Sequence, residues 1–341
     1  AVIRPTAASA ACTGFDDLPE TADCYESVMY LAECEIAAGT GNDCFSPEQL
    51  ITVEQWVVML CRAYGVETIG DSWQDVGRSS VVEAYRKGWL NETALSAPRS
   101  PMCRSMLVES AFAAADIPVY DSTLYEGGAS LSTADNILRV GRELGLCSDD
   151  ADTNALVTRG DAAIILHVVL TQSFRIEEPP VPVTLVNAAG VNVNDFLLEL
   201  RKLPEQVLDA FNAAGWTYCI DFDYMGGLSK KLNMSCIGAT NYSQKTIYIS
   251  EASATLHEFG HFLDWMLGFP AEHEQLYLAE AQNSGLRDYA KTNAREYFAD
   301  CFAYWVKYAE NANAISLLQE CAPLTFRYMG KITDSGYTCS K

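Results

Sequence analysis

Two histidines and a glutamate stand at a spacing that suits metal catalysis: His257-Glu258-Phe259-Gly260-His261. On a helix, residues four apart lie one turn apart on the same face, so both imidazoles could bind one tetrahedral zinc ion. Glu258 would lie beside the metal without binding it, where a carboxylate can act as the general base that takes a proton from water. The spacing therefore indicates a metallopeptidase.

The residues around this motif predict a buried helix. Residues 252–267 carry apolar side chains on more than one face, and Gly268 and Pro270 mark the end of the helix. Burying an ionisable side chain is costly unless it is paired or binds a metal. We therefore expect a zinc site here, and the alternative interpretation is an unusually polar core helix that binds nothing.

A third zinc ligand is expected further along the chain. A metzincin-type site would need glycine at position 264 and histidine at 267, but Asp264 and Leu267 stand there. A second apolar helix begins near Asn293, and within it Glu296 is the candidate ligand. Alternatively, Glu296 closes a capping-box-like turn with Asn293. Asp300, one turn later, is either the rival ligand or a hydrogen-bond partner for a zinc histidine.

Together, these two stretches resemble the catalytic domain of anthrax lethal factor and its relatives, the secreted Pro-Pro endopeptidases. Residues 257–264, HEFGHFLD, and 293–302, NAREYFADCF, carry the resemblance. The resemblance implies three zinc ligands, which are His257, His261 and Glu296. It also implies that Glu258 is the base and that Tyr289, seven residues before the glutamate ligand, donates a hydrogen bond to the developing oxyanion.

Short strands and helices are expected to position this site. Alternating apolar and polar residues predict three strands, over residues 216–222, 237–240 and 245–250. One or two helices are predicted over residues 193–214, with an interruption at Pro204, and a turn is predicted at 225–227. The last strand leads directly into the zinc helix. We expect it to be the edge on which an extended peptide substrate adds one more strand.

The first half of the chain repeats a pattern of two helices joined by a loop. The three copies cover about 14–66, 72–116 and 120–172. They resemble S-layer homology repeats, which pack as a pseudo-threefold helical bundle and attach exported bacterial proteins to cell-wall polysaccharide. That family uses a Thr-Arg pair at the start of each second helix. Here the pair is Thr158-Arg159 in the third copy, Val53 replaces the arginine in the first, and Pro98-Arg99 stands in the second.

An alternative role for this helical half is scaffolding, or shaping the access of substrate. Residues 177–182 read Glu-Glu-Pro-Pro-Val-Pro, which is typical of a stiff, extended linker. The expected division is an N-terminal extension over 1–13, the repeats over 14–174, the linker over 175–185 and a zinc metallopeptidase domain over 186–341.

Net charge and hydropathy limit the classes of binding partner that this chain can have. A net charge of −22 argues against nucleic acid or an anionic membrane as the main partner. The longest apolar run, residues 162–170, is too short to cross a bilayer. His167 within that run is expected to be a satisfied core histidine, whereas His273, between two glutamates, is expected to be a solvated surface group. The sequence does not indicate an oligomeric state.

Twelve cysteines, an even and high number for this length, favour disulfide bonds and an extracellular location. The alternative is a set of reduced core cysteines. The absence of a C-x-x-C pair argues against clustered zinc or thioredoxin-type chemistry. Seven cysteines precede the linker and five follow it, so complete pairing requires a bridge between the halves; otherwise one cysteine in each half is free. Cys219 and Cys236 could join neighbouring strands. The chain begins at Ala1 rather than methionine, which fits the removal of an export signal.

We therefore expect an α+β protein, with a mainly helical repeat domain followed by a mixed α/β domain of the zincin type. The expected function is that of a secreted, cell-wall-associated zinc metalloendopeptidase that cleaves extended protein segments, including proline-rich ones. The alternative is a cell-surface binding or adhesion protein whose zinc-site domain is not a useful catalyst. The presence of both Glu258 and Tyr289 favours the enzyme, because a non-catalytic site has no physical need for either.

Overall fold

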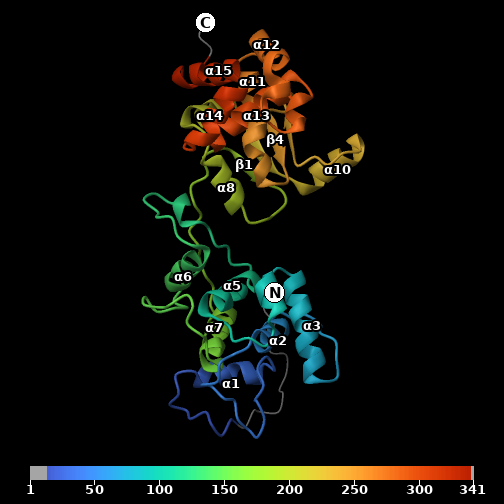
Figure 1. Ribbon diagram of the computed structural model, residues 1–341. Helices are drawn as coiled ribbons and strands as arrows, with labels where there is room; N and C mark the ends of the chain where they lie inside the picture. The colour runs from blue at the N-terminus through green and yellow to red at the C-terminus, as the bar shows by residue number, and fades with distance from the viewer. Residues whose placement is uncertain (1–13, 339–341) are drawn as a thin grey trace. The chain divides into compact units, whose positions relative to one another are not determined.

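The structure, a computed structural model, describes residues 14–338 and forms two compact units. The first contains the described chain up to Thr123 together with Gly127–Glu178, and the second contains Leu124–Glu126 and the chain from Pro179 onward. Helices dominate both units, and the described residues form one small sheet, which confirms the α+β class (Figure 1). The finer limits of repeats, linker and domains remain predictions.

In the first unit, most helices begin at a residue whose side chain accepts a hydrogen bond from the first turn. Such caps stand at Thr52, Ser72, Ser132 and Thr158. The helices are α1 (Tyr25–Glu33), α2 (Val53–Ala63), α3 (Trp73–Arg86), α4 (Glu92–Ser96), α5 (Arg104–Ala114), the 3-10 helix η1 (Ser122–Leu124), α6 (Thr133–Glu143) and α7 (Arg159–Thr171).

These helices form a pseudo-threefold bundle, as expected. Helix α2 packs on α3, α5 on α6, and α7 on α1, so the pairing closes on itself. Three backbone hydrogen bonds repeat the same cycle at the bundle centre. The N–H of Ile51 donates to the carbonyl of Val157, Val157 donates to Met102, and Met102 donates to Ile51, with N···O distances of 3.0 Å each. Each of the three residues lies just before α2, α5 or α7, so the three segments are equivalent.

The same cycle corrects the position of one arginine. The N–H of Val53 donates to Ser100, that of Arg104 to Ala155 and that of Arg159 to Gln49, which aligns these three donors. Arg104, and not Arg99, is therefore the counterpart of Arg159 in the second copy. Helix α5 begins at Arg104 rather than near Arg99 because the preceding residues pair with the other copies instead of forming a helical turn.

The second unit contains a four-stranded sheet in the order β1-β2-β4-β3, in which β1, β2 and β4 are parallel and β3 is antiparallel. Its strands are β1 (Leu185–Asn187), β2 (Thr217–Ile220), β3 (Gly238–Asn241) and β4 (Thr246–Ile249). Its helices are α8 (Asn194–Leu200), α9 (Glu205–Ala213), α10 (Phe222–Leu232), η2 (Ala252–Ala254), α11 (Thr255–Met266), α12 (Ala271–Glu280), η3 (Ala281–Asn283), η4 (Asp288–Lys291), α13 (Ala294–Lys307), α14 (Ala312–Cys321) and α15 (Pro323–Asp334).

Two local predictions for this unit are wrong. Strand β4, which leads into α11, lies between β2 and β3, so β3 and not β4 is the edge strand on this side of the sheet. The crossover from β2 to β4 is parallel, and β3 turns back antiparallel on the outside. The predicted turn at residues 225–227 belongs to helix α10. The side chain of Asp221 caps that helix by accepting from the N–H of Tyr224, which starts the helix before the two glycines.

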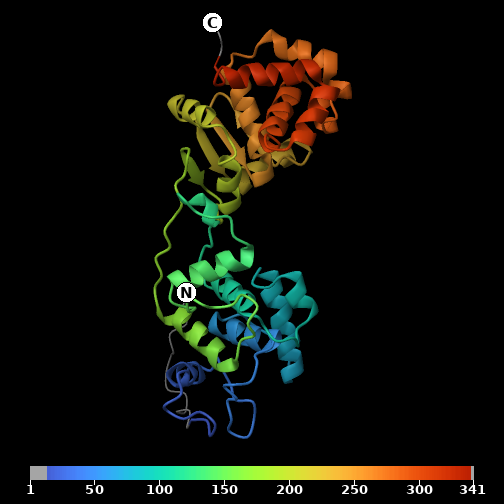
Figure 2. The same ribbon diagram turned by 60° about the vertical axis from the view of Figure 1, so that its left-hand side comes forward.

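An aromatic core holds α11 against the sheet. Phe259 and Phe262 on one face of α11 pack on Phe211 of α9, with ring centroids 4.8 and 5.1 Å apart, and Phe262 also contacts Trp216 at 5.2 Å. All four side chains are almost completely buried. Helix α13 packs along another face of α11, and α12 and α15 contact α13 in turn, so the later helices gather together (Figures 1 and 2).

The predicted surface position of His273 is also wrong. His273 is only 4 % exposed, its Nδ1 lies 2.7 Å from Asp264 Oδ1, and its Nε2 lies 2.8 Å from the hydroxyl of Tyr328. Its ring stacks on Phe298 at 3.8 Å. The flanking glutamates misled the prediction, because neighbours on a helix point about 100° apart and can be exposed while the residue between them is buried. His167 is a satisfied histidine as expected, with its Nδ1 3.0 Å from Ser27 Oγ.

The structure shows no disulfide bond among the ten described cysteines, all of which are free thiols. The disulfide prediction, including the pair of Cys219 and Cys236, is wrong for these residues. Several serve instead as small apolar side chains in the cores, as Cys61 and Cys301 do at 1 % and 0 % exposure. Cys12 and Cys339 lie outside the described residues, as does the predicted N-terminal extension. Among the described helices, none has the length and apolar character to cross a membrane.

Candidate active site

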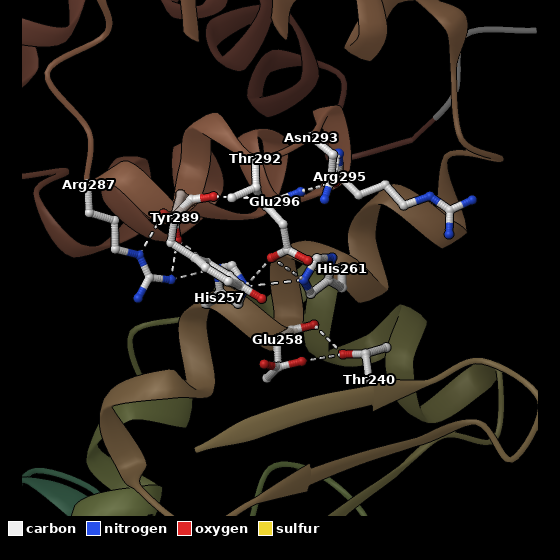
Figure 3. A network of polar contacts seen from close by, with 11 residues as sticks. Thr240, His257, Glu258, His261, Arg287, Tyr289, Thr292, Asn293, Arg295 and Glu296 are labelled. Carbon is white, nitrogen blue, oxygen red and sulfur yellow. Dashed lines mark hydrogen bonds and ion pairs between the residues drawn. The ribbon is translucent and has the colours of Figure 1, made fainter. Parts of the chain in front are cut away.

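Helices α11 and α13 bring the three predicted zinc ligands together (Figure 3). The Nε2 atoms of His257 and His261 lie 3.1 Å apart, and Glu296 Oε2 lies 3.0 Å from the first and 3.2 Å from the second. Both histidines are buried, whereas Glu296 is partly buried. Within the described residues, these three form the one group of ligand atoms close enough to share a metal ion.

The chemistry of these atoms fits a metal. His257 Nδ1 lies 2.6 Å from Asp300 Oδ1 and donates its proton there, so Nε2 is the nitrogen that offers its lone pair once a metal ion displaces its proton. That nitrogen faces the second imidazole and a carboxylate, and a group of ligand atoms this close together is stabilised by a cation between them, either a proton or a metal ion. Zinc–nitrogen bonds of 2.0–2.1 Å at tetrahedral angles place two ligand nitrogens roughly 3.3 Å apart. The observed separation is close to this value.

The same charges set the pKa values of the ligands. Burial by itself would lower the pKa of His257, but hydrogen bonds to Asp300 and Glu296 outweigh it and raise the pKa to about 9. Burial would raise the pKa of Glu296, but its hydrogen bonds to His257 and His261 bring the pKa well below its usual range. The carboxylates of Asp300 and Glu296 therefore favour positive charge at this point of the site.

Asp300 and Glu296, the two candidates for the third ligand, lie on different sides of the His257 ring. Asp300 lies one turn beyond Glu296 and binds His257 on the far side of the imidazole, away from the ligand cluster. It has the geometry of a partner that orients a zinc histidine. Asn293 caps α13 by accepting from the N–H groups of Arg295 and Glu296, while the Glu296 carboxylate points to the histidines (Figure 3). The side chain of Glu296 is thus directed to the cluster rather than to the cap.

Glu258 lies next to the cluster and is held by the edge strand. Thr240 of β3 donates its hydroxyl to Glu258 Oε2 at 2.7 Å. Burial raises the pKa of Glu258, because the charged carboxylate is poorly solvated there. Gly238 of the same strand leaves room for this side chain, since a Cβ at Gly238 would lie 2.6 Å from Glu258 Oε1. The strand, the carboxylate and the metal-ligand cluster therefore form one continuous site.

Tyr289 also lies next to the cluster, in the short helix η4. Its ring centroid is 5.9 Å from that of His257, and the side chain is 42 % exposed. Partial burial, together with the nearby charges of Glu296 and Glu258, raises the pKa of Tyr289 to about 12. The hydroxyl is therefore protonated at neutral pH and can donate a hydrogen bond.

Two cavities meet at these side chains and form a cleft across the cluster. One has a volume of about 770 Å³ and extends toward Tyr304 and Lys307 at the end of α13. The other has a volume of about 570 Å³ and extends along β3 toward α10. His257, Glu258 and Tyr289 line both cavities. A ligand longer than a single residue can therefore lie across the site on both sides.

Comparison with known families agrees with this geometry. Residues 201–332 match the family of anthrax toxin lethal factor, N- and C-terminal domain. Residues 14–54 match the S-layer homology domain. Among solved structures, the Pro-Pro endopeptidase PPEP-2 of Paenibacillus alvei is similar at 19 % identity and a TM-score of 0.34, over 43 % of this chain and 96 % of that one. No curated protein sequence matches the chain.

The resemblance to both families is therefore confirmed, and the lethal factor-like domain contains every predicted site residue. The sequence analysis missed three residues of this domain that contact the site: Gly238, Thr240 and Arg287. The glycine and the threonine come from the edge strand, whose position the sequence did not reveal. Arg287 stands two residues before Tyr289, and a lone arginine in a loop carries no signal of its own.

Proposed function

We propose that this chain is a secreted, zinc-dependent metalloendopeptidase that hydrolyses peptide bonds in extended protein segments. The observation that carries the proposal is the trio of His257, His261 and Glu296, whose ligand atoms lie within 4.8 Å of one another beside the buried carboxylate of Glu258. The match of residues 201–332 to the lethal factor family supports a metallopeptidase. In this proposal the site is of the gluzincin type, with glutamate as the third ligand.

The side chains divide the work of hydrolysis. A zinc ion held by the three ligands would supply Lewis acidity, polarising the peptide carbonyl and making water more acidic. Glu258 takes the proton from the attacking water and later gives it to the leaving amine, with Thr240 holding the carboxylate in place. Tyr289 donates its hydroxyl hydrogen to the oxygen that gains charge as the carbonyl is attacked.

The edge strand offers a place for the substrate backbone. The N–H of Ser250 donates to Ile237, and hydrogen-bonded pairs alternate along an antiparallel ladder. The backbone groups of Gly238 and Thr240 therefore point away from β4, toward the open edge beside Glu258. An extended peptide can pair with these groups, which would hold its scissile bond over the cluster.

Metal analysis combined with peptide digestion tests the proposal. We expect about one zinc per wild-type chain and a clear loss in Glu296→Ala, since a zinc site needs three protein ligands. Glu258→Gln should keep the zinc and slow cleavage by about 10²–10⁴-fold, the usual contribution of a general base. Glu205→Gln, an exposed glutamate on α9, is the matched control and should cleave like the wild type.

The digestion should use a peptide library with and without Pro–Pro sequences. Faster cleavage at Pro–Pro would support a preference for proline-rich segments, and cleavage elsewhere would reject it. Full activity in Glu258→Gln, or a wild-type protein that binds no zinc, would overturn the proposed function.

The first unit supports a second, separate proposal, namely attachment to cell-wall polysaccharide at the cell surface. The match of residues 14–54 to the S-layer homology domain carries it. The resemblance to that family implies that the arginines of its Thr-Arg pairs bind the anionic glycan. Arg159 is not available for glycan binding, because it is buried and donates to the carbonyls of Phe45 and Ala38. Arg104, at the equivalent position, is partly exposed, and we propose it as the glycan-binding arginine.

Sedimentation of the protein with purified cell-wall polysaccharide tests this attachment. Arg104→Ala should weaken it, and Arg99→Ala is the control from the misassigned position. If the wild type binds polysaccharide but cleaves no peptide, the chain would be a surface-binding protein rather than an enzyme.

A further inference from the structure

We propose that Arg287 is a positioning residue that fastens the segment carrying Tyr289 to the metal ligand His257. This inference rests on the proposed peptidase function. It concerns a residue outside the ligand set and outside the pair of Glu258 and Tyr289. The structural basis is that the guanidinium of Arg287 contacts both Asp300, which bonds to His257, and Tyr289 (Figure 3).

The first contact is a bidentate ion pair between Arg287 and Asp300. Arg287 Nε donates to Asp300 Oδ2 and Arg287 NH2 donates to Asp300 Oδ1, both at 2.6 Å. The same Oδ1 accepts from His257 Nδ1 at 2.6 Å. Because Asp300 can turn about its own side-chain bonds, an arginine that grips both oxygens fixes the plane of the carboxylate. That plane in turn fixes the ring of His257, so Arg287 determines where the ligand nitrogen points.

The second contact is with Tyr289. The guanidinium carbon lies 5.2 Å from the centre of the Tyr289 ring, within the range of a cation–π contact. Tyr289 is 42 % exposed, so packing alone holds it weakly. Arg287 precedes η4 directly, and its carbonyl accepts from the N–H of Ala290, the buried residue of that helix. A shift of Arg287 would therefore move the tyrosine together with the short helix that carries it.

Other contacts also hold this segment, including a hydrogen bond between the side chains of Tyr289 and Glu296. The hydroxyl of Tyr277 donates to the carbonyl of Lys291, and Lys291 pairs with Asp288 within η4. These contacts keep the segment folded when Arg287 is replaced. Arg287 itself has a side chain that is 56 % exposed, so shortening it opens no cavity in the core. Its replacement should thus change the site without unfolding the domain.

The experiment compares Arg287→Ala and Arg287→Lys with wild type, using Arg327→Ala, an arginine of α15 remote from the site, as the matched control. Two readouts do not depend on peptide cleavage: the zinc dissociation constant, and the visible spectrum of the protein loaded with cobalt. We expect Arg287→Ala to weaken zinc binding about tenfold and to change the cobalt spectrum. Arg287→Lys should restore part of the affinity, because lysine keeps the charge but cannot grip both oxygens. Arg327→Ala should match wild type.

Steady-state kinetics at saturating zinc then test the link to Tyr289. We expect Arg287→Ala to lower kcat by about 10–100-fold and to change KM less than threefold. In a Tyr289→Phe background, Arg287→Ala should lower kcat by a clearly smaller factor, because the hydroxyl that Arg287 positions is already gone. Equal factors in the two backgrounds would show that Arg287 does not act through Tyr289.

Two further results would overturn the proposal. A large rise in KM with unchanged kcat would mean that Arg287 contacts the substrate directly in the larger cavity. If Arg287→Ala leaves both the zinc affinity and the cobalt spectrum unchanged, Arg287 does not position His257. If wild type binds zinc but cleaves no peptide, the peptidase function fails separately, and the zinc and cobalt measurements still decide whether Arg287 positions His257.

Discussion

Gly260 of α11 lies directly against the backbone of Ala299 in α13. A Cβ at Gly260 would stand 2.6 Å from the Cα of Ala299 and 2.7 Å from its carbonyl oxygen, closer than atoms approach in folded proteins. The glycine at this point of the motif therefore allows α11 and α13 to come close together. His261 directly follows Gly260 in α11, and Glu296 lies about one turn before Ala299 in α13. The close approach of the two helices at this point therefore brings the candidate ligands His261 and Glu296 within reach of one metal ion.

We expect Gly260→Ala to destabilise the second unit by about 1–3 kcal/mol, because the new methyl group meets backbone that cannot move aside easily. Zinc affinity should fall as well, since the helix carrying Glu296 is pushed away from the histidines. Urea unfolding and metal analysis measure the two effects. Gly227→Ala in α10 is the control: its Cβ would meet nothing within 4 Å, and its stability should be unchanged or higher.

Gly238→Ala should act on catalysis rather than on the metal. The added methyl group would lie 2.6 Å from Glu258 Oε1 and 2.8 Å from its Cγ, and so would displace the base from its hydrogen bond with Thr240. We expect kcat to fall by about 10²-fold or more, within the range that a general base contributes, while zinc content stays at the wild-type level. Gly226→Ala, with open space around its Cβ, should be fully active. A zinc-free Gly238→Ala protein would contradict this view.

Removing the imidazole of His273 should lower stability strongly. His273→Ala removes the imidazole that bonds both to the buried carboxylate of Asp264 and to the hydroxyl of Tyr328. The expected cost is about 3 kcal/mol in the free energy of unfolding. His167→Ala should cost clearly less, because His167 is only partly buried and makes one side-chain hydrogen bond. Chemical denaturation of the two variants under the same conditions tests the difference, and equal losses would contradict it.

The stability of the first unit should fall at alkaline pH. Burial raises the pKa of the Cys61 thiol from 9.0 to about 11, and that of Tyr64 from 10.0 to about 12. As the pH rises above 9, the unfolded chain loses these protons first, so the stabilisation present below pH 9 is progressively lost up to the folded pKa values. For Cys61 the loss at pH 10 is on the order of 1 kcal/mol. Urea unfolding at pH 8 and 10 measures it, and Cys61→Ala should show a flatter dependence.

Much of the secondary structure could be read from local pattern. The helix predicted over 252–267 is observed as α11 over 255–266. That helix, its end at Gly268 and the break between α8 and α9 at Pro204 follow from periodicity, glycine and proline, which act on their immediate neighbours. Local pattern did not predict the features that depend on contacts with residues far away in the sequence. The start of α5 depends on pairing with two other repeats, and the place of β3 at the edge depends on the parallel crossover from β2 to β4.

The sequence by itself determined the chemistry of the site. The identity and spacing of His257, Glu258 and His261 predict two ligands and a base because an α-helix has a fixed period, and Glu296 on a later helix is the predicted third ligand. Only the tertiary structure decided that Asp300 orients His257 instead of joining the cluster, and that Arg287 links Asp300 to the Tyr289 segment. The physical reason is that the helical period sets contacts within four residues, whereas contacts between helices depend on how closely the whole core allows them to pack.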